Sequence, residues 1–173
     1  LEINLDAISH NLNFYKSKLK PETKIMAMVK AFGYGNGGYE IAKLLEHHKV
    51  DYLGVAFADE GIELRKAGIS TPIMVLNPEN NSFRAMIAYN LEPEIYSITG
   101  LQAFLKIAQH QNISHYPIHI KLDTGMHRLG FEPHLISELC SLLKNNNFVK
   151  VKSVFSHLSA SDDLQFDDFT KLQ

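Results

Sequence analysis

The chain has 173 residues, of which 45% are hydrophobic and 21% are charged, so it is long enough for one domain with a substantial core. Its formal net charge of −2 gives no electrostatic basis for binding nucleic acid or an anionic membrane. Cys140 is the lone cysteine, which excludes an intramolecular disulfide, and its apolar neighbours predict a buried packing role. No segment has the length of a membrane span or the layout of a signal peptide, so a cytoplasmic protein is expected.

Strand-like and helix-like segments alternate along the chain. The first helical pattern opens with Asp6 as its N-cap, and Gly68 and Pro72 mark the end of a later helix and the start of the next strand. The expected strands span residues 24–30, 52–57, 72–77, 91–97, 116–123 and 149–157, and the expected helices span 6–19, 38–47, 58–67, 82–89, 99–111 and 134–145. Repeated βα units predict a parallel sheet in one domain, without a linker.

The strand expected at 116–123 favours a barrel over a doubly wound sheet. Its residues alternate between an aliphatic face and a polar face that carries His119, Lys121 and Asp123. Helices cover the outer face of a parallel sheet, so the polar face would point inward, where the upper layer of a barrel can use it. Six units are too few for a closed (β/α)8 barrel, and both chain ends look cut. We therefore expect residues 1–173 to be part of a longer protein.

Lys30 stands between the strand-like run 24–29 and the glycine loop 31–38. A lysine at the end of a buried strand, beside backbone that a ligand can approach closely, suits a Schiff-base amine for an aldehyde cofactor. The alternative is a solvated lysine that ends a strand, which is the commoner situation for a single lysine. The loop itself lacks the endings of a P-loop and of a dinucleotide fingerprint.

Two further segments carry polar residues at expected strand ends. Lys121, Asp123 and Arg128 surround one strand end, where burying charge is costly unless the groups pair or bind a ligand. The last strand ends at His157, which alone would more often be a capping or packing residue, and a polar loop follows it. The other eight histidines have no metal-like spacing, so they are expected at the surface and no metal site is expected.

Taken together, three segments resemble the signature motifs of alanine racemases, in the family's order. They are 28–37 around Lys30, 119–130, and 156–163, and the opening 2–11 is also similar to that family. The resemblance covers the whole chain but only the N-terminal half of a typical racemase. It implies a (β/α)8 TIM-type barrel that is incomplete here, with about six of eight units and without the C-terminal β domain. The residues around Lys30, from Lys24 through the glycine loop, are most similar to racemases that are fused behind a peptidoglycan-precursor ligase. Such a ligase would then precede Leu1.

The resemblance implies pyridoxal 5'-phosphate as the cofactor and assigns roles to five residues. Lys30 would hold the cofactor as a Schiff base and act as the acid and base on one face of the substrate, and Tyr34 would help bind the phosphate. Arg128 would contact the cofactor's phenolic oxygen and the substrate carboxylate, and His157 would support the pyridine ring. Lys121 matches a position that is carbamylated in many members. As a carbamate it would pair with Arg128, and as a cation it would pair with Asp123. One departure is His127, where many members have glycine.

The implied activity is racemisation of L- and D-alanine, which supplies D-alanine for peptidoglycan, by a homodimer. Proton transfer on both faces of the substrate needs two groups, and neither Tyr34 nor Tyr96 is well placed as the second. In the family this second group is a tyrosine on the partner's C-terminal domain, so this chain alone should be inactive. The alternatives are a related racemase or decarboxylase of other specificity, and a non-catalytic barrel that carries pyridoxal phosphate. The segment 119–130 counts against the carrier.

Overall fold

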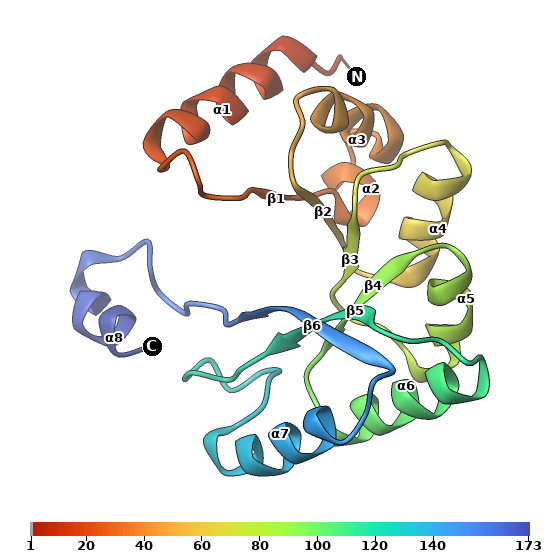
Figure 1. Ribbon diagram of the computed structural model, residues 1–173. Helices are drawn as coiled ribbons and strands as arrows, with labels where there is room; N and C mark the ends of the chain where they lie inside the picture. The colour runs from red at the N-terminus through yellow and green to blue at the C-terminus, as the bar shows by residue number, and fades with distance from the viewer. Residues whose placement is uncertain (1) are drawn as a thin grey trace. The chain divides into compact units, whose positions relative to one another are not determined.

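The computed structural model describes residues 2–173, which divide into two compact units, one ending at Glu92 and one spanning Pro93–Gln173 (Figure 1). The first unit contains α1 (Leu5–Lys18), β1 (Met26–Met28), α2 (Lys30–Tyr34), α3 (Gly38–His47), β2 (Tyr52–Val55), α4 (Ala58–Lys66), β3 (Ile73–Val75), η1 (Asn80–Ser82) and α5 (Phe83–Ala88). The strand β4 (Leu91–Ile95) crosses the boundary. The second unit continues with α6 (Ile98–His110), β5 (Tyr116–Lys121), η2 (Pro133–Leu135), α7 (Ile136–Lys144), β6 (Val149–Phe155), η3 (Leu164–Phe166) and α8 (Asp167–Leu172).

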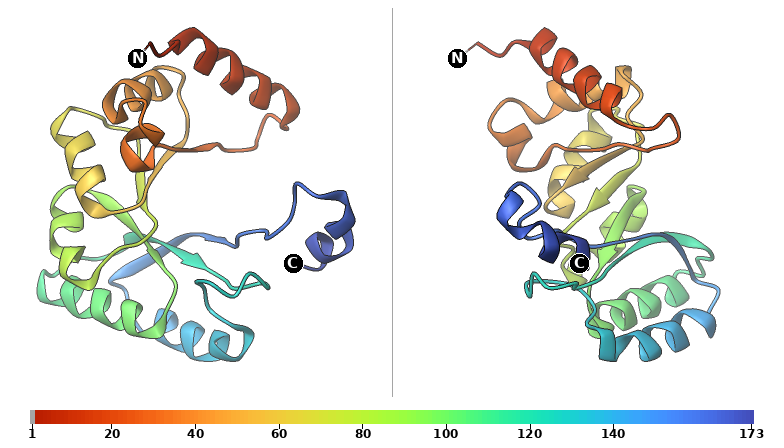
Figure 2. Two further views of the ribbon diagram at one scale, coloured as in Figure 1. Left: turned by 180° about the vertical axis from the view of Figure 1, so that it is seen from behind. Right: turned by 90° about the vertical axis from the view of Figure 1, so that its left-hand side faces the viewer.

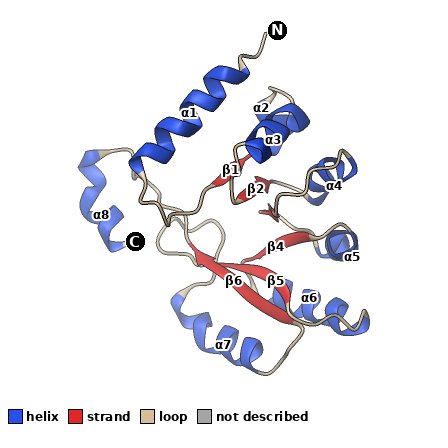
Figure 3. Cartoon of the chain, turned by 45° about the horizontal axis from the view of Figure 1, so that its top comes forward, coloured by secondary structure: helices blue, strands red, loops and turns tan. Residues whose placement is uncertain are grey.

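In the first unit β1 pairs with β2 and β2 pairs with β3, both in parallel. The centre is made by Leu53, Val55, Ile73 and Val75, all without exposed surface. Such uniformly apolar strands are typical of a parallel sheet that is covered on both faces. The helices α3 and α4 lie on one side of β1 and β2 (Figure 3), and α3 buries one stripe, as an amphipathic helix does.

In the second unit β4 pairs with β5 and β5 pairs with β6, again in parallel. The helices α6 and α7 lie on the same side of β5 and β6 (Figures 1 and 2). Leu101, Phe104 and Ala108 of α6 are fully buried, and their spacing of three and four residues places them on one helical face. This face packs over the sheet and leaves the carboxyl ends of the strands to the loops.

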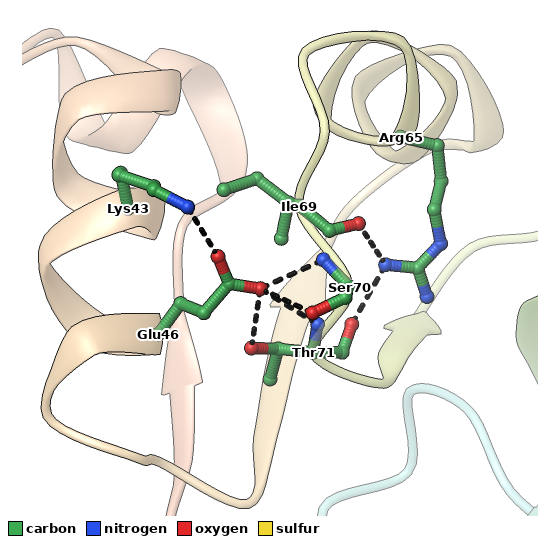
Figure 4. Close-up of polar contacts among 6 residues, drawn as sticks. All are labelled: Lys43, Glu46, Arg65, Ile69, Ser70 and Thr71. Atoms are coloured by element: carbon green, nitrogen blue, oxygen red, sulfur yellow. Dashed lines mark hydrogen bonds and ion pairs between the residues drawn. The ribbon is translucent and has the colours of Figure 1, made fainter.

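Two charged side chains fasten the segment that leads into β3 (Figure 4). Glu46 of α3 accepts hydrogen bonds from the backbone N–H of Ser70 at 2.7 Å and of Thr71 at 3.1 Å, and Lys43 lies 2.9 Å from its other oxygen. From the opposite side, Arg65 of α4 donates to the carbonyl oxygens of Ile69 at 2.8 Å and Thr71 at 2.7 Å. These contacts fix the entry into β3 and thereby its register with β2.

Each helix and strand predicted from the sequence is found, in the predicted order. Gly68 ends α4 as expected, with a φ of +89° that glycine adopts easily. Most strands end about two residues earlier than predicted: the first covers Met26–Met28 rather than 24–30, and the fifth covers Tyr116–Lys121 rather than 116–123. The residues just after each strand can still bond to the neighbouring strand, as Val29 does to Gly54, but they begin the loops that carry the polar side chains.

Three local predictions are wrong. The N-cap of α1 is Asn4, whose side chain accepts the N–H of Ala7 at 3.0 Å, while Asp6 lies in the first turn, where its charge suits the helix dipole. Cys140 is exposed, because α7 buries the face that carries its neighbour Leu139. His119 is 1% exposed instead of at the surface, because β5 is covered on both faces. Within residues 2–173, no helix is both long and apolar enough to span a membrane.

Candidate functional site

Lys30 directly follows the carboxyl end of β1, as the sequence predicts. Its neighbour Val29 is 2% exposed and donates its N–H to the carbonyl of Gly54 on β2 at 2.8 Å, so the backbone entering Lys30 is held by the sheet. The side chain of Lys30 is half-buried, and within residues 2–173 it forms no hydrogen bond or ion pair. A lysine with a fixed backbone and an uncommitted amine can react with a carbonyl compound.

The segment after Lys30 is a left-handed turn rather than an irregular glycine loop. Ala31, Phe32, Gly33 and Tyr34 have φ values of +52°, +55°, +62° and +56°. The turn is closed by backbone hydrogen bonds, among them Gly35 N–H to the carbonyl of Ala31 at 3.0 Å. For residues other than glycine this conformation is unfavourable, and such strain is found most often at functional sites. The side chain of Tyr34 is 61% exposed at the end of the turn.

One carboxylate joins this turn to the loop after β2. Glu60, in the first turn of α4, accepts the N–H of Ala31 at 2.6 Å through one oxygen. Its other oxygen accepts the N–H groups of Ala56 at 2.7 Å and Phe57 at 3.2 Å. Our sequence analysis missed Glu60. Its place three residues after Phe57 fits a capping interaction, but no sequence pattern shows the contact with Ala31.

In the second unit Lys121 ends β5 and is buried against Glu94 of β4. Their Nζ and Oε1 atoms lie 3.2 Å apart, and Glu94 has no exposed surface. Burial raises the pKa of the Glu94 carboxyl from its ordinary 4.5 to about 7, although the charges of Lys121 and Arg128 act in the opposite direction. Within residues 2–173, neither oxygen of Glu94 accepts a well-formed hydrogen bond, so the contact with Lys121 offsets only part of the cost of its burial.

The pairing of Lys121 with Asp123, one of the two arrangements expected from the sequence, is not the one found. Asp123 instead accepts the backbone N–H groups of Gly125 and His127, both at 3.0 Å, and its other oxygen lies 3.3 Å from Nδ1 of His127. The hydrogen bonds from Gly125 and His127 lower the pKa of the Asp123 carboxyl. His127 therefore helps to shape this loop with Asp123.

The loop from Leu122 to Phe131 presents Arg128 at its exposed tip. Its base is closed by two backbone hydrogen bonds, from Phe131 to the carbonyl of Lys121 at 2.8 Å and from Asp123 to the carbonyl of Phe131 at 3.0 Å. A side chain at Gly130 would collide with the backbone of Leu122 and Asp123, and Gly130 also has a φ of +136°. The loop therefore holds Arg128 close enough for its charge to act on Glu94.

His157 lies two residues beyond the end of β6 and is exposed at the start of the polar loop that leads to Asp163. The five residues singled out in the sequence thus follow or end β1, β5 and β6 at their carboxyl ends. Lys30 and Tyr34 belong to the first unit, and Lys121, Arg128 and His157 belong to the second.

A family model described as "Alanine racemase, N-terminal domain" matches residues 3–173. The chain belongs to this family. A curated alanine racemase of Thermodesulfovibrio yellowstonii is 38% identical over 168 residues, which cover 95% of this chain and 45% of that protein. This chain therefore spans slightly under half the length of such a relative.

Solved alanine racemases share the fold of this chain. The enzyme of Clostridium difficile 630, in complex with cycloserine, matches with a TM-score of 0.91 and 36% identity over 98% of this chain and 47% of that one. The enzyme from E. faecalis matches with a TM-score of 0.87 and 30% identity, covering 98% and 46%. The expected fold class, an α/β barrel of the TIM type that is incomplete here, is confirmed. Alanine racemases are isomerases that depend on pyridoxal phosphate.

Proposed function

We propose that this chain is the cofactor-binding part of an alanine racemase, which interconverts L- and D-alanine with pyridoxal phosphate bound at Lys30. The observation that carries the proposal is the state of Lys30: a half-buried amine that forms no ion pair within residues 2–173, at a strand end, followed by a strained turn. Such an amine fits an aldehyde cofactor, and membership of the alanine racemase family supports the choice of reaction. Residues 1–173 would then form the N-terminal part of one barrel domain.

When bound, pyridoxal phosphate withdraws electrons from the substrate's α-carbon and so makes its proton acidic. In our proposal Nζ of Lys30 would hold the cofactor in the absence of substrate and, once the substrate's amine has displaced it, the freed Nζ would move a proton to or from the α-carbon on one face. The exposed hydroxyl of Tyr34 is available to help bind the phosphate. The guanidinium of Arg128 would bind the phenolic oxygen of the cofactor and the substrate carboxylate, because its planar donors suit oxygen anions. His157 would support the pyridine ring.

Lys121 is proposed to act as a carbamate, formed when carbon dioxide adds to the neutral amine with loss of a proton. The carbamate is an anion and would pair with Arg128. It would also face Glu94, and two adjacent buried anions repel each other strongly. The raised pKa of Glu94 supports an arrangement in which Glu94 is protonated and donates a hydrogen bond to the carbamate. This chemistry requires the present ion pair between Lys121 and Glu94 to be released first.

The second proton-transfer group is proposed to come from the other subunit of a homodimer, as a tyrosine in a C-terminal domain. The relatives have more than twice the length that this chain matches, which leaves room for such a domain in them. The complete protein is proposed to be cytoplasmic, to supply D-alanine for peptidoglycan, and to be fused to a peptidoglycan-precursor ligase ahead of Leu1. The residue sequence around Lys30 supports the proposed fusion to a ligase.

The test uses a full-length protein that carries this chain, with pyridoxal phosphate and borohydride, which fixes a cofactor–lysine linkage for peptide mapping. We expect the label on Lys30 and interconversion of the alanine enantiomers. Lys30→Ala should abolish the label. It should also lower the rate of racemisation by at least about 10²-fold, which is the smallest effect expected from loss of a general base. Lys24→Ala, at an exposed lysine before β1, should keep both.

Four results would contradict the proposal. A label on another lysine would overturn the assignment of Lys30, and cofactor binding without any racemisation would favour the carrier barrel. Faster turnover of another amino acid than of alanine would favour a related enzyme. A fragment of residues 1–173 with substantial racemase activity would refute the need for a partner subunit.

A further inference from the structure

The left-handed turn after Lys30 needs something to hold it. Ala31, Phe32 and Tyr34 have left-handed backbone although each carries a side chain, so each would relax to a commoner conformation if the turn were free. The backbone hydrogen bonds that close the turn are contacts between neutral groups within the segment itself. A turn of unfavourable residues persists when the surrounding structure over-determines it.

Glu60 supplies a constraint from outside the turn. Its hydrogen bond with Ala31 is short, at 2.6 Å, joins residues 29 positions apart, and involves a charged acceptor. Hydrogen bonds to an ionised acceptor are about twice as strong as those between neutral groups. The bond acts on the peptide group between Lys30 and Ala31. It therefore fixes the backbone from which the Lys30 side chain departs.

Glu60 is itself held on a rigid element. Ala58, Gly61 and Leu64 of the same helix are buried, and at Gly61 the helix lies so close to Leu91 that a built Cβ would be only 3.0 Å from that side chain. The second oxygen of Glu60 is fixed by the N–H groups of Ala56 and Phe57. A helix cap alone would need only these last two contacts, so the bond to Ala31 is an additional function of the same carboxylate.

We infer that Glu60 is a positioning residue for Lys30: its carboxylate holds the left-handed turn and so fixes the direction in which the Lys30 amine leaves β1. The inference rests on the proposed function, in which Lys30 binds the cofactor. The neighbouring residue Glu63, three residues along α4, is exposed, and within residues 2–173 its side-chain carboxylate forms no hydrogen bond or ion pair, which makes it a matched control.

The experiment compares three variants of the full-length protein with the wild type. Glu60→Gln keeps the shape of the side chain but turns one acceptor oxygen into an NH2 donor, which cannot bond to an N–H group. Glu63→Gln removes a charge from the same helix. The double variant Glu60→Gln with Ala31→Gly tests the mechanism directly, because glycine adopts left-handed backbone without a penalty.

The first readout is amide hydrogen exchange in the protein without cofactor. Glu60→Gln should speed exchange at residues 31–35 by about tenfold or more, since each tenfold change corresponds to the loss of roughly one such hydrogen bond. The second readout is the affinity for pyridoxal phosphate, titrated by the absorbance of the lysine-linked form. We expect the Kd to rise about tenfold in Glu60→Gln and to stay at the wild-type value in Glu63→Gln. Ala31→Gly should restore most of the affinity in the double variant.

A purely structural role predicts a different pattern. If Glu60→Gln lowers the melting temperature but leaves exchange at residues 31–35 and the Kd unchanged, the inference is overturned. Failure of Ala31→Gly to restore affinity also contradicts it, even where the single variant folds poorly. A wild-type protein without lysine-linked absorbance would overturn the proposed function instead, and hydrogen exchange would still decide whether Glu60 holds the turn.

Discussion

The buried ion pair between Lys121 and Glu94 leads to a double-mutant prediction. The side chain of Lys121 is 9% exposed and that of Glu94 is not exposed at all, so neither charge can turn to water if its partner is removed. Breaking a pair of this kind from one side costs about 3–5 kcal/mol, because it leaves one buried charge without compensation. Lys121→Met leaves the Glu94 carboxylate buried without its counter-ion, so we expect this variant to destabilise the second unit by about this amount near pH 8. Glu94→Gln should cost less, because burial already favours the neutral form of this side chain.

The free energy of unfolding of the second unit in the double variant should be much closer to that of the wild type. Replacing both charges by neutral groups of similar volume removes their mutual attraction and the cost of desolvating them together, and such exchanges are often neutral or stabilising. We expect the double variant to lie within about 1 kcal/mol of the wild type, which gives a coupling energy of several kcal/mol between the two sites. Hydrogen exchange of the β5 amides, which reports local unfolding free energies, measures all four proteins.

The pH dependence of the same pair gives a second check. The pKa of Glu94 is raised from 4.5 to about 7 in the folded protein, so between these values the folded state binds more protons than the unfolded state. Stability should therefore be fully present below pH 4.5 and should fall as the pH rises towards 7, by about 3 kcal/mol from this group. Glu94→Gln should remove this slope. Additive single variants, or a slope that survives Glu94→Gln, would refute the reasoning.

Two further predictions concern the fold. Glu46→Gln should destabilise the first unit by about 1–2 kcal/mol at pH 7, because hydrogen bonds from Lys43 and from Ser70 and Thr71 hold the carboxylate. The same contacts lower the pKa of Glu46 to about 2. The stability that its carboxylate contributes should therefore be lost as the pH falls from about 4.5 through 2. Urea unfolding at pH 7 and at pH 3 can test this. Gly130→Ala should displace the loop that carries Arg128 and weaken cofactor binding at least tenfold in a titration, because its Cβ meets backbone. Gly68→Ala, with a φ of +89° but open space around it, should cost only about 1 kcal/mol and leave binding unchanged.

The sequence was sufficient for the order of the elements and for the position of Lys30 at the carboxyl end of β1, but not for the residues that surround the candidate site. Glu94 was missed because a carboxylate next to Pro93 on a strand usually indicates an exposed edge, and its partner Lys121 lies on a different strand. The left-handed turn was missed because Ala31, Phe32 and Tyr34 are not residues that signal positive φ. In both places tertiary contacts determine the local state, and a single sequence does not show them.

The two lysines at strand ends explain how one fold can give the same residue type different chemistry. Lys121 is committed to a buried carboxylate and must give up that contact before its nitrogen can form a new bond. Lys30 has no such contact within residues 2–173, and the carboxylate of Glu60, which accepts the N–H of the next residue, is bonded to backbone N–H groups. Glu60 can therefore shape the backbone around Lys30 without occupying its amine. Of the two lysines, Lys30 is thus the one that can react with an aldehyde without first breaking an ion pair.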